Sequence, residues 1–137
     1  MPTAGYSGTP LAKKLGIKTG FAIWIHNQPE HYLELFDDLP DDLDFVNEPK
    51  EESLDFIHLF VKEMAVLSEV APKAKGYLKK NGTLWVSWPK GASKISTDLS
   101  RDPIREYLLG IGLVDVKVAA VDENWSGLKF VYRVKDR

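Results

Sequence analysis

Three continuous apolar runs constrain the fold of this chain more than any other feature. They are Phe21–His26, Leu54–Val61 and Thr83–Trp88. Each run has the length of a strand and shows no alternation with polar residues, which is typical of a strand buried on both faces. Such strands require helices on both sides of their sheet. The runs therefore predict a largely parallel sheet between two helical layers.

The remaining segments alternate between helical and strand patterns. Apolar residues recur at helical spacing in four of them, and three others are short and rich in strand-forming residues. The predicted helices are Leu11–Leu15, Asn27–Leu39, Lys62–Lys80 and Ser100–Ile111, and the further predicted strands are Leu43–Val46, Val114–Val121 and Leu128–Val134. Asn27 is the expected cap of the second helix, Pro72 predicts a kink or restart in the third, and Asn81-Gly82 predicts its end. The short connection between the last two strands predicts an antiparallel hairpin.

This order of elements predicts a single α/β domain over residues 1–137, in which residues 1–16 form an N-terminal loop and a short helix. Right-handed crossovers make it a three-layer Rossmann-like sheet, mostly parallel, with a C-terminal antiparallel hairpin. The plan resembles the class I methyltransferase fold. In that family a helix and a strand are expected between Val46 and Leu54, where only residues 47–53 stand. The predicted topology is therefore a truncated, methyltransferase-like one.

Charge and cysteine content exclude several classes of protein. The chain has 18 Lys+Arg against 20 Asp+Glu, a net charge of −2, and no cysteine. This balance argues against a general nucleic-acid binder, and the missing cysteine excludes disulfides, thiolate zinc sites and thiol nucleophiles. No apolar run reaches the length of a membrane helix, and the N-terminus does not resemble a signal peptide. We therefore expect a cytoplasmic protein with no membrane or nucleic-acid partner.

A closer resemblance covers most of the chain. The blocks that carry it are Gly5–Leu11, Leu54–Phe60, Leu84–Lys90, Thr97–Leu99 and Val121–Lys129. They resemble a small bacterial family filed as a domain of unknown function. The resemblance implies a bacterial cytosolic protein and implies no reaction.

The cofactor signature of methyltransferases is missing after the first strand. The family places an acidic residue and a glycine-rich turn there, because glycine lets the backbone approach S-adenosylmethionine closely. Here the stretch His26-Asn27-Gln28-Pro29-Glu30 contains no glycine. Glu48 matches only loosely the acid that holds the ribose after the second strand. The cofactor, and whether the protein is an enzyme, are therefore left open.

The predicted ligand site lies at the carboxyl ends of the strands, where open α/β sheets bind their ligands at the switch point. We place that switch between the first run and the run at Leu54–Val61. The loop after the third run adds an aromatic face, hydroxyls and lysines, which suit a phosphate or a nucleotide. The predicted ligand-binding residues are Trp88, Lys90, Ser93, Lys94, Thr97, His26 and Gln28. The alternative is an ordinary polar loop in which Thr97 or Ser100 caps the next helix.

Other polar residues are weaker candidates. Asp122 and Glu123 could bind a metal or act as acid and base, but such residues are more often part of a turn, and no metal site is predicted. We expect their turn to lie at the opposite end of the sheet from the loop after Trp88. His58, inside an apolar strand, reads as a hydrogen-bonded core histidine. The segment Tyr6–Thr9 reads as a packed terminus rather than a lid.

Three functions follow from these observations. The leading one is a non-enzymatic or cryptic Rossmann-like module that binds a small anionic ligand or a protein partner. The first alternative is a noncanonical transferase that depends on S-adenosylmethionine or a nucleotide. The second is a homodimeric scaffold, formed through the edge strand of the final hairpin. No catalytic residue is assigned.

Overall fold

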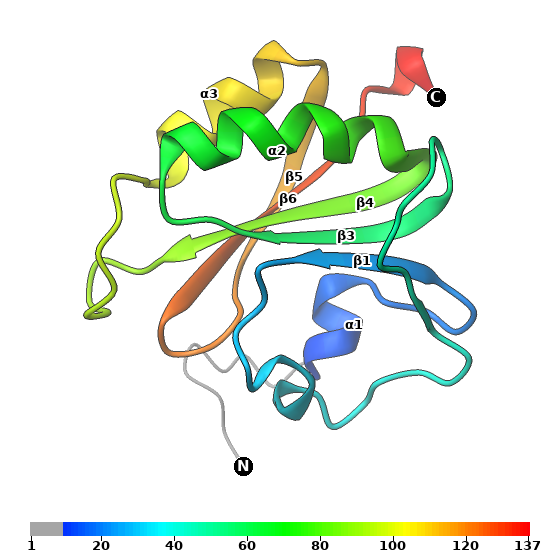
Figure 1. The fold of residues 1–137 in the computed structure, drawn as a ribbon, viewed down its shortest axis with the longest axis horizontal. Helices are drawn as coiled ribbons and strands as arrows, with labels where there is room; N and C mark the ends of the chain where they lie inside the picture. Colours follow the sequence, from blue (N-terminus) through cyan, green and yellow to red (C-terminus); the bar gives the residue numbers. More distant parts are fainter. Residues whose placement is uncertain (1–9) are drawn as a thin grey trace.

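The structure, a computed structural model, describes residues 10–137 and is built on one six-stranded sheet (Figure 1). Positions 5–9 of the family resemblance and the segment Tyr6–Thr9 therefore lie outside the described residues. The strands are β1 (Ala22–His26), β2 (Asp44–Phe45), β3 (Leu54–Phe60), β4 (Leu78–Pro89), β5 (Leu113–Ala120) and β6 (Trp125–Tyr132). The helices are α1 (Leu11–Leu15), α2 (Met64–Tyr77) and α3 (Arg101–Gly110), with short 3-10 helices η1 (Tyr32–Leu35) and η2 (Val134–Asp136).

The strands stand in the order β2-β1-β3-β4-β6-β5. The first four are parallel to one another, and β6 runs antiparallel to both β4 and β5. Residues 46–53 hold neither a helix nor a strand. The predicted Rossmann-like sheet, its antiparallel hairpin and its truncation are therefore confirmed.

Helices cover both faces of the sheet. α2 and α3 pack on one face, and α1 with η1 packs on the other (Figure 1). On the α1 face, the fully buried Trp85 of β4 donates a hydrogen bond from its indole Nε1 to the Leu15 carbonyl, at 2.8 Å. Within residues 10–137, no helix is both long and apolar enough to cross a membrane.

The predictions around β1 are partly wrong. Only Ile23 of this strand is buried, because its outer neighbour β2 has just two residues and the helices of the α2 face lie over β3 and β4 instead. The helix predicted after Asn27 is reduced to the single 3-10 turn η1, which starts after His31. Asn27 cannot cap a helix because its φ is +57°, whereas a cap residue is normally in the extended region.

The boundary between α2 and β4 also differs from the prediction. α2 ends at Tyr77, and Leu78 already pairs with Leu54 of β3, so Asn81-Gly82 lies within β4. α2 continues through Pro72 without a restart. Proline has no N–H to donate to the carbonyl four residues earlier, and here the Tyr107 hydroxyl donates to that Ser68 carbonyl at 3.1 Å.

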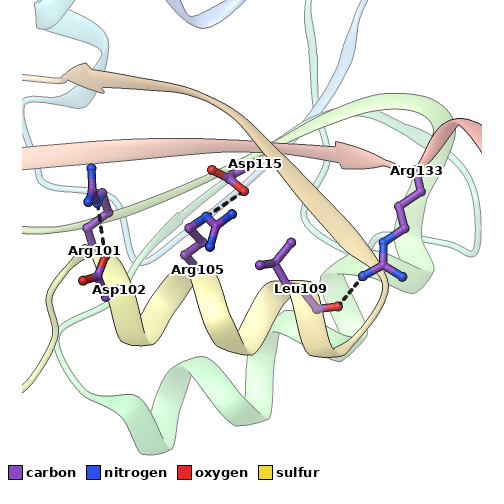
Figure 2. Close-up of polar contacts among 6 residues, drawn as sticks. All are labelled: Arg101, Asp102, Arg105, Leu109, Asp115 and Arg133. Carbon is purple, nitrogen blue, oxygen red and sulfur yellow. Dashed lines mark hydrogen bonds and ion pairs between the residues drawn. The ribbon is translucent and has the colours of Figure 1, made fainter.

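Polar contacts fix α3 against the hairpin (Figure 2). Arg105 Nε lies 3.0 Å from Asp115 Oδ1 on β5. Arg133 Nη2 donates to the Leu109 carbonyl in the last turn of the helix, at 2.8 Å. Ser100 occupies the position before the helix, as expected, but its side chain makes no capping hydrogen bond. α3 is thus tied to β5 and to the segment after β6.

Candidate functional site

The carboxyl edge of the parallel strands brings together four segments of the chain. Segments 27–31, 61–63 and 90–100 follow β1, β3 and β4, and the turn 121–124 precedes β6. Because β6 is antiparallel to β4, its start meets the end of β4, and the Lys90 amide donates to the Asn124 carbonyl at 2.8 Å. The prediction that this turn lies far from the loop after Trp88 is therefore wrong.

The loop after β4 uses its hydroxyl groups to hold its own shape. Ser93 Oγ donates to the Lys90 carbonyl at 2.8 Å. Thr97 Oγ1 donates to the Lys62 carbonyl at 2.6 Å and accepts a hydrogen bond from the Leu99 amide. Asp98 Oδ1 accepts the Met64 amide at the start of α2, at 2.8 Å, so a carboxylate already caps that helix. A polar cavity of about 380 Å³ lies beside it, lined by Lys62, Glu63, Ser96, Thr97 and Asp98.

The structure does not bring the predicted ligand residues into one cavity. Trp88 is 8% exposed and belongs to the core, so its ring does not form the exposed aromatic face that we expected. Thr97 lines the polar cavity, whereas His26 lines a groove on the α2 face of β1. Lys94 and Gln28 are exposed. Ligand binding at these residues stays a prediction.

The groove at His26 is the second candidate, and we call it the β1 groove. Its volume is about 390 Å³, and its lining residues are Trp24, His26, Pro49, Val66, Glu69, Val70, Lys73 and Tyr77. The rings of Trp24 and Tyr77 meet edge to face, with centroids 5.6 Å apart and an interplanar angle of 89°. Two aromatic rings beside aliphatic side chains, with a few charged groups, are typical of a small-molecule site.

The position of the β1 groove matches the predicted switch point. The chain passes from β1 outward to β2 and then returns to the other side of β1 as β3, so the order of strands reverses between β1 and β3. Trp24 and His26 belong to β1, and α2 directly follows β3. Burial lowers the pKa of His26, and the nearby carboxylate of Glu69 partly opposes this shift. The groove therefore holds a mainly neutral imidazole at neutral pH.

His58 is confirmed as a hydrogen-bonded core histidine. It is fully buried, with its Nδ1 3.0 Å from Tyr32 Oη and its Nε2 2.7 Å from Ser87 Oγ. Its ring stacks on Phe60, with centroids 4.2 Å apart. Burial lowers the pKa of His58 to about 3. This network links η1, β3 and β4 inside the core, away from the ligand cavities.

Asp122 organises the turn before β6. Its Oδ1 accepts the amides of Asn124 and Trp125 at 2.8 and 2.9 Å, and its Oδ2 lies 3.0 Å from His31 Nε2. Within the described part of the chain, no group of three or more His, Cys, Asp or Glu residues could hold a metal ion. Asp122 thus acts as a turn residue that also ties the segment after β1 to the hairpin.

Comparison with known proteins identifies the architecture. No family model and no curated protein matches the sequence. A putative type 11 methyltransferase from Sulfolobus solfataricus aligns with a TM-score of 0.60 at 15% identity, covering 90% of each chain. This chain has a methyltransferase-like Rossmann fold. At such identities the likeness establishes the fold alone.

Two further methyltransferase structures show the same likeness. One is the complex between the Haloferax volcanii Trm112 methyltransferase activator and the putative methyltransferase, with a TM-score of 0.64 at 13% identity over 89% of this chain and 86% of that one. The other is the Burkholderia thailandensis 1,6-didemethyltoxoflavin-N1-methyltransferase with bound S-adenosylhomocysteine, with a TM-score of 0.55 at 10% identity over 89% and 74%.

The methyltransferase-like fold implies S-adenosylmethionine, and the turn after β1 does not fit its usual cradle. Asn27 takes the left-handed backbone conformation, at φ +57°, but it carries a side chain where a glycine would leave room. Pro29 cannot donate an N–H, and Glu48 is an exposed residue after β2. This turn therefore lacks the close backbone approach that a glycine-rich turn gives to S-adenosylmethionine. The aromatic β1 groove, in contrast, is suited to a planar ring.

Proposed function

We propose that this protein is a noncanonical transferase that binds S-adenosylmethionine or a related nucleoside with the planar base in the β1 groove. The observation that carries the proposal is an aromatic groove at the switch point of a methyltransferase-like sheet. The likeness to methyltransferases supports this alternative better than the non-enzymatic module that we placed first.

The lining residues suit the parts of a nucleoside. The rings of Trp24 and Tyr77 offer apolar surface to a base, and stacking on an aromatic side chain contributes about 1–3 kcal/mol per base. The Glu69 carboxylate can accept hydrogen bonds from ribose hydroxyls. The neutral imidazole of His26 can donate or accept a hydrogen bond at a base edge.

Binding of S-adenosylhomocysteine tests this proposal. At a concentration of about one hundred times its Kd, the ligand should stabilise the folded chain by about 2.7 kcal/mol, measured as a thermal shift. Trp24→Ala should weaken binding by about 5- to 150-fold in calorimetry, because the base loses a stacking partner. The matched control is Phe45→Ala, which removes an exposed aromatic ring from the neighbouring strand and should leave the affinity unchanged. Absence of any shift with millimolar S-adenosylhomocysteine or adenosine would exclude the transferase and favour a non-enzymatic module.

An anionic ligand at the loop after β4 is a second proposal. The hydroxyl groups of Ser93 and Thr97 donate to backbone carbonyls, so they already have partners. Lys90 and Lys94, in contrast, make no ion pair among residues 10–137, and this supports the proposal. The double variant Lys90→Ala/Lys94→Ala should weaken the binding of inorganic phosphate without lowering the thermal midpoint, since neither side chain is part of the core. Calorimetry at low salt measures the affinity. Equal binding by the double variant would contradict the proposal.

A further inference from the structure

Three lysines converge on the α1 face of the hairpin. Lys117 of β5 and Lys129 of β6 are direct register partners across the two strands. Lys14 of α1 joins them, because Lys117 Nζ donates to the Lys14 carbonyl at 3.1 Å and Lys14 Nζ donates to the Ala120 carbonyl at 3.2 Å. We call these three residues the lysine cluster.

Within residues 10–137, no carboxylate forms an ion pair with this cluster. Residues 1–9 contain no aspartate or glutamate that could supply one. On the other face of the same hairpin, in contrast, Asp115 is paired with Arg105 at 3.0 Å (Figure 2). Asp115 of the hairpin is therefore paired on the α3 face, whereas Lys117 and Lys129 make no ion pair within the described residues on the α1 face.

The ammonium groups act on one another. Burial and the charge of Lys117 lower the pKa of Lys14, and the charge of Lys90 adds to the effect. Burial together with the charges of Lys117 and Lys18 lowers the pKa of Lys129. Like charges placed directly opposite each other destabilise a pair of strands. Backbone carbonyls compensate Lys14 and Lys117 in part, but Lys129 has no such partner among the described residues. A side chain placed at a cost in stability often marks a functional position.

We propose that the lysine cluster binds a multivalent phosphate anion, such as pyrophosphate or the diphosphate group of a nucleotide. Such an anion would relieve the repulsion. Lys14 is buried and its Nζ donates to the Ala120 carbonyl, so Lys117 and Lys129 would contact the anion and Lys14 would add its charge. The hydrogen bonds of Lys14 and Lys117 to backbone carbonyls connect α1 to β5, which gives these two lysines a structural role. Lys129 makes no side-chain hydrogen bond within the described residues, so it has no such role. The cluster lies on the opposite face of the sheet from the β1 groove, so this proposal does not depend on the transferase.

Titration of the full chain with pyrophosphate at low salt tests the proposal. Lys129→Gln should weaken binding by about tenfold or more, because one charged contact is lost. Lys135→Gln, which changes an exposed lysine of η2, is the matched control and should bind like the wild type. Without ligand, the thermal midpoint of Lys129→Gln at low salt should equal or exceed that of the wild type, because repulsion is relieved and no hydrogen bond among the described residues is broken.

Several outcomes would overturn the proposal. One is that the wild type does not bind pyrophosphate at low salt, and another is that Lys129→Gln binds it equally well. An equal loss of affinity in Lys94→Gln, which changes a lysine of the loop after β4, would place the anion on that loop instead. A nucleic-acid backbone offers the same phosphate chemistry. Binding of a short single-stranded oligonucleotide that depends on Lys129, without binding of pyrophosphate, would overturn the small-anion proposal.

Discussion

Replacing Trp85 with alanine should lower the free energy of unfolding by about 3–5 kcal/mol. Trp85 is fully buried on the central strand β4, and its indole Nε1 is the donor to the Leu15 carbonyl at 2.8 Å. Its ring also lies against Gly127, where an added Cβ would be only 3.0 Å from a ring carbon. The variant therefore loses core volume and the contact that fixes the end of α1. Urea unfolding followed by circular dichroism measures the change.

Two further variants separate the hydrogen bond of Trp85 from its core volume and provide a surface control. Trp85→Phe retains most of the apolar contact but leaves the Leu15 carbonyl without its donor, so we expect a smaller loss of about 1–3 kcal/mol. Leu33→Ala removes an exposed side chain and should change stability by less than about 0.5 kcal/mol. If Trp85→Ala does not fold, the first of these variants carries the measurement. A loss below about 1 kcal/mol in both Trp85 variants would show that the ring does not anchor α1.

Acid should destabilise this protein through His58. The pKa of His58 is about 3 in the folded chain and about 6.5 when it is exposed by unfolding. Between these values the unfolded state binds a proton that the folded state does not, so stability is fully present above pH 6.5 and is lost as pH falls. The loss is about 1.4 kcal/mol per pH unit, or about 2 kcal/mol at pH 5. Urea midpoints at pH 7, 6 and 5 test this slope.

His58→Gln isolates the contribution of His58 from that of other titrating groups. Glutamine can still donate to or accept from Tyr32 and Ser87, but it does not titrate. The variant should be less stable at neutral pH and should lose stability less steeply between pH 6.5 and 5, by about 1.4 kcal/mol per pH unit. The comparison with the wild type is needed because burial also lowers the pKa of His26, so protonation of His26 also reduces stability as the pH falls. Identical slopes in the two proteins would assign acid unfolding to other groups.

The central strands could be predicted from sequence because a strand that is buried on both faces is a continuous apolar run. β3 and β4 fill the middle of the sheet, and their side chains are apolar in continuous runs. The elements that were missed depend on distant partners. Asn81-Gly82 is a good local stop signal, yet pairing of Leu78 with Leu54 extends β4 through it. The helix predicted after Asn27 is only the 3-10 turn η1, whose Tyr32 makes a core contact with His58 that no local pattern predicts.

The candidate sites were only partly predictable for the same reason. The edge of the sheet and the switch point follow from the order of elements. His26 ends β1 and lines the groove there, and ligand binding at His26 stays a prediction. Trp24 and Trp88 both lie in apolar runs, so the sequence does not distinguish their exposure. Trp88 belongs to the core beneath α2 and α3, whereas Trp24 is only partly buried and lines the groove beside α2. The lysine cluster joins residues from α1, β5 and β6, and no local pattern reveals that they converge.

The place of β6 between β4 and β5 has a consequence for how this chain is made. A ribosome completes β1 to β5 before β6 exists, so the inner edge of β4 waits without its neighbour during synthesis. Open strand edges with apolar side chains are the surfaces through which nascent chains aggregate. A chain that stops before Trp125 would therefore expose this edge of β4 permanently.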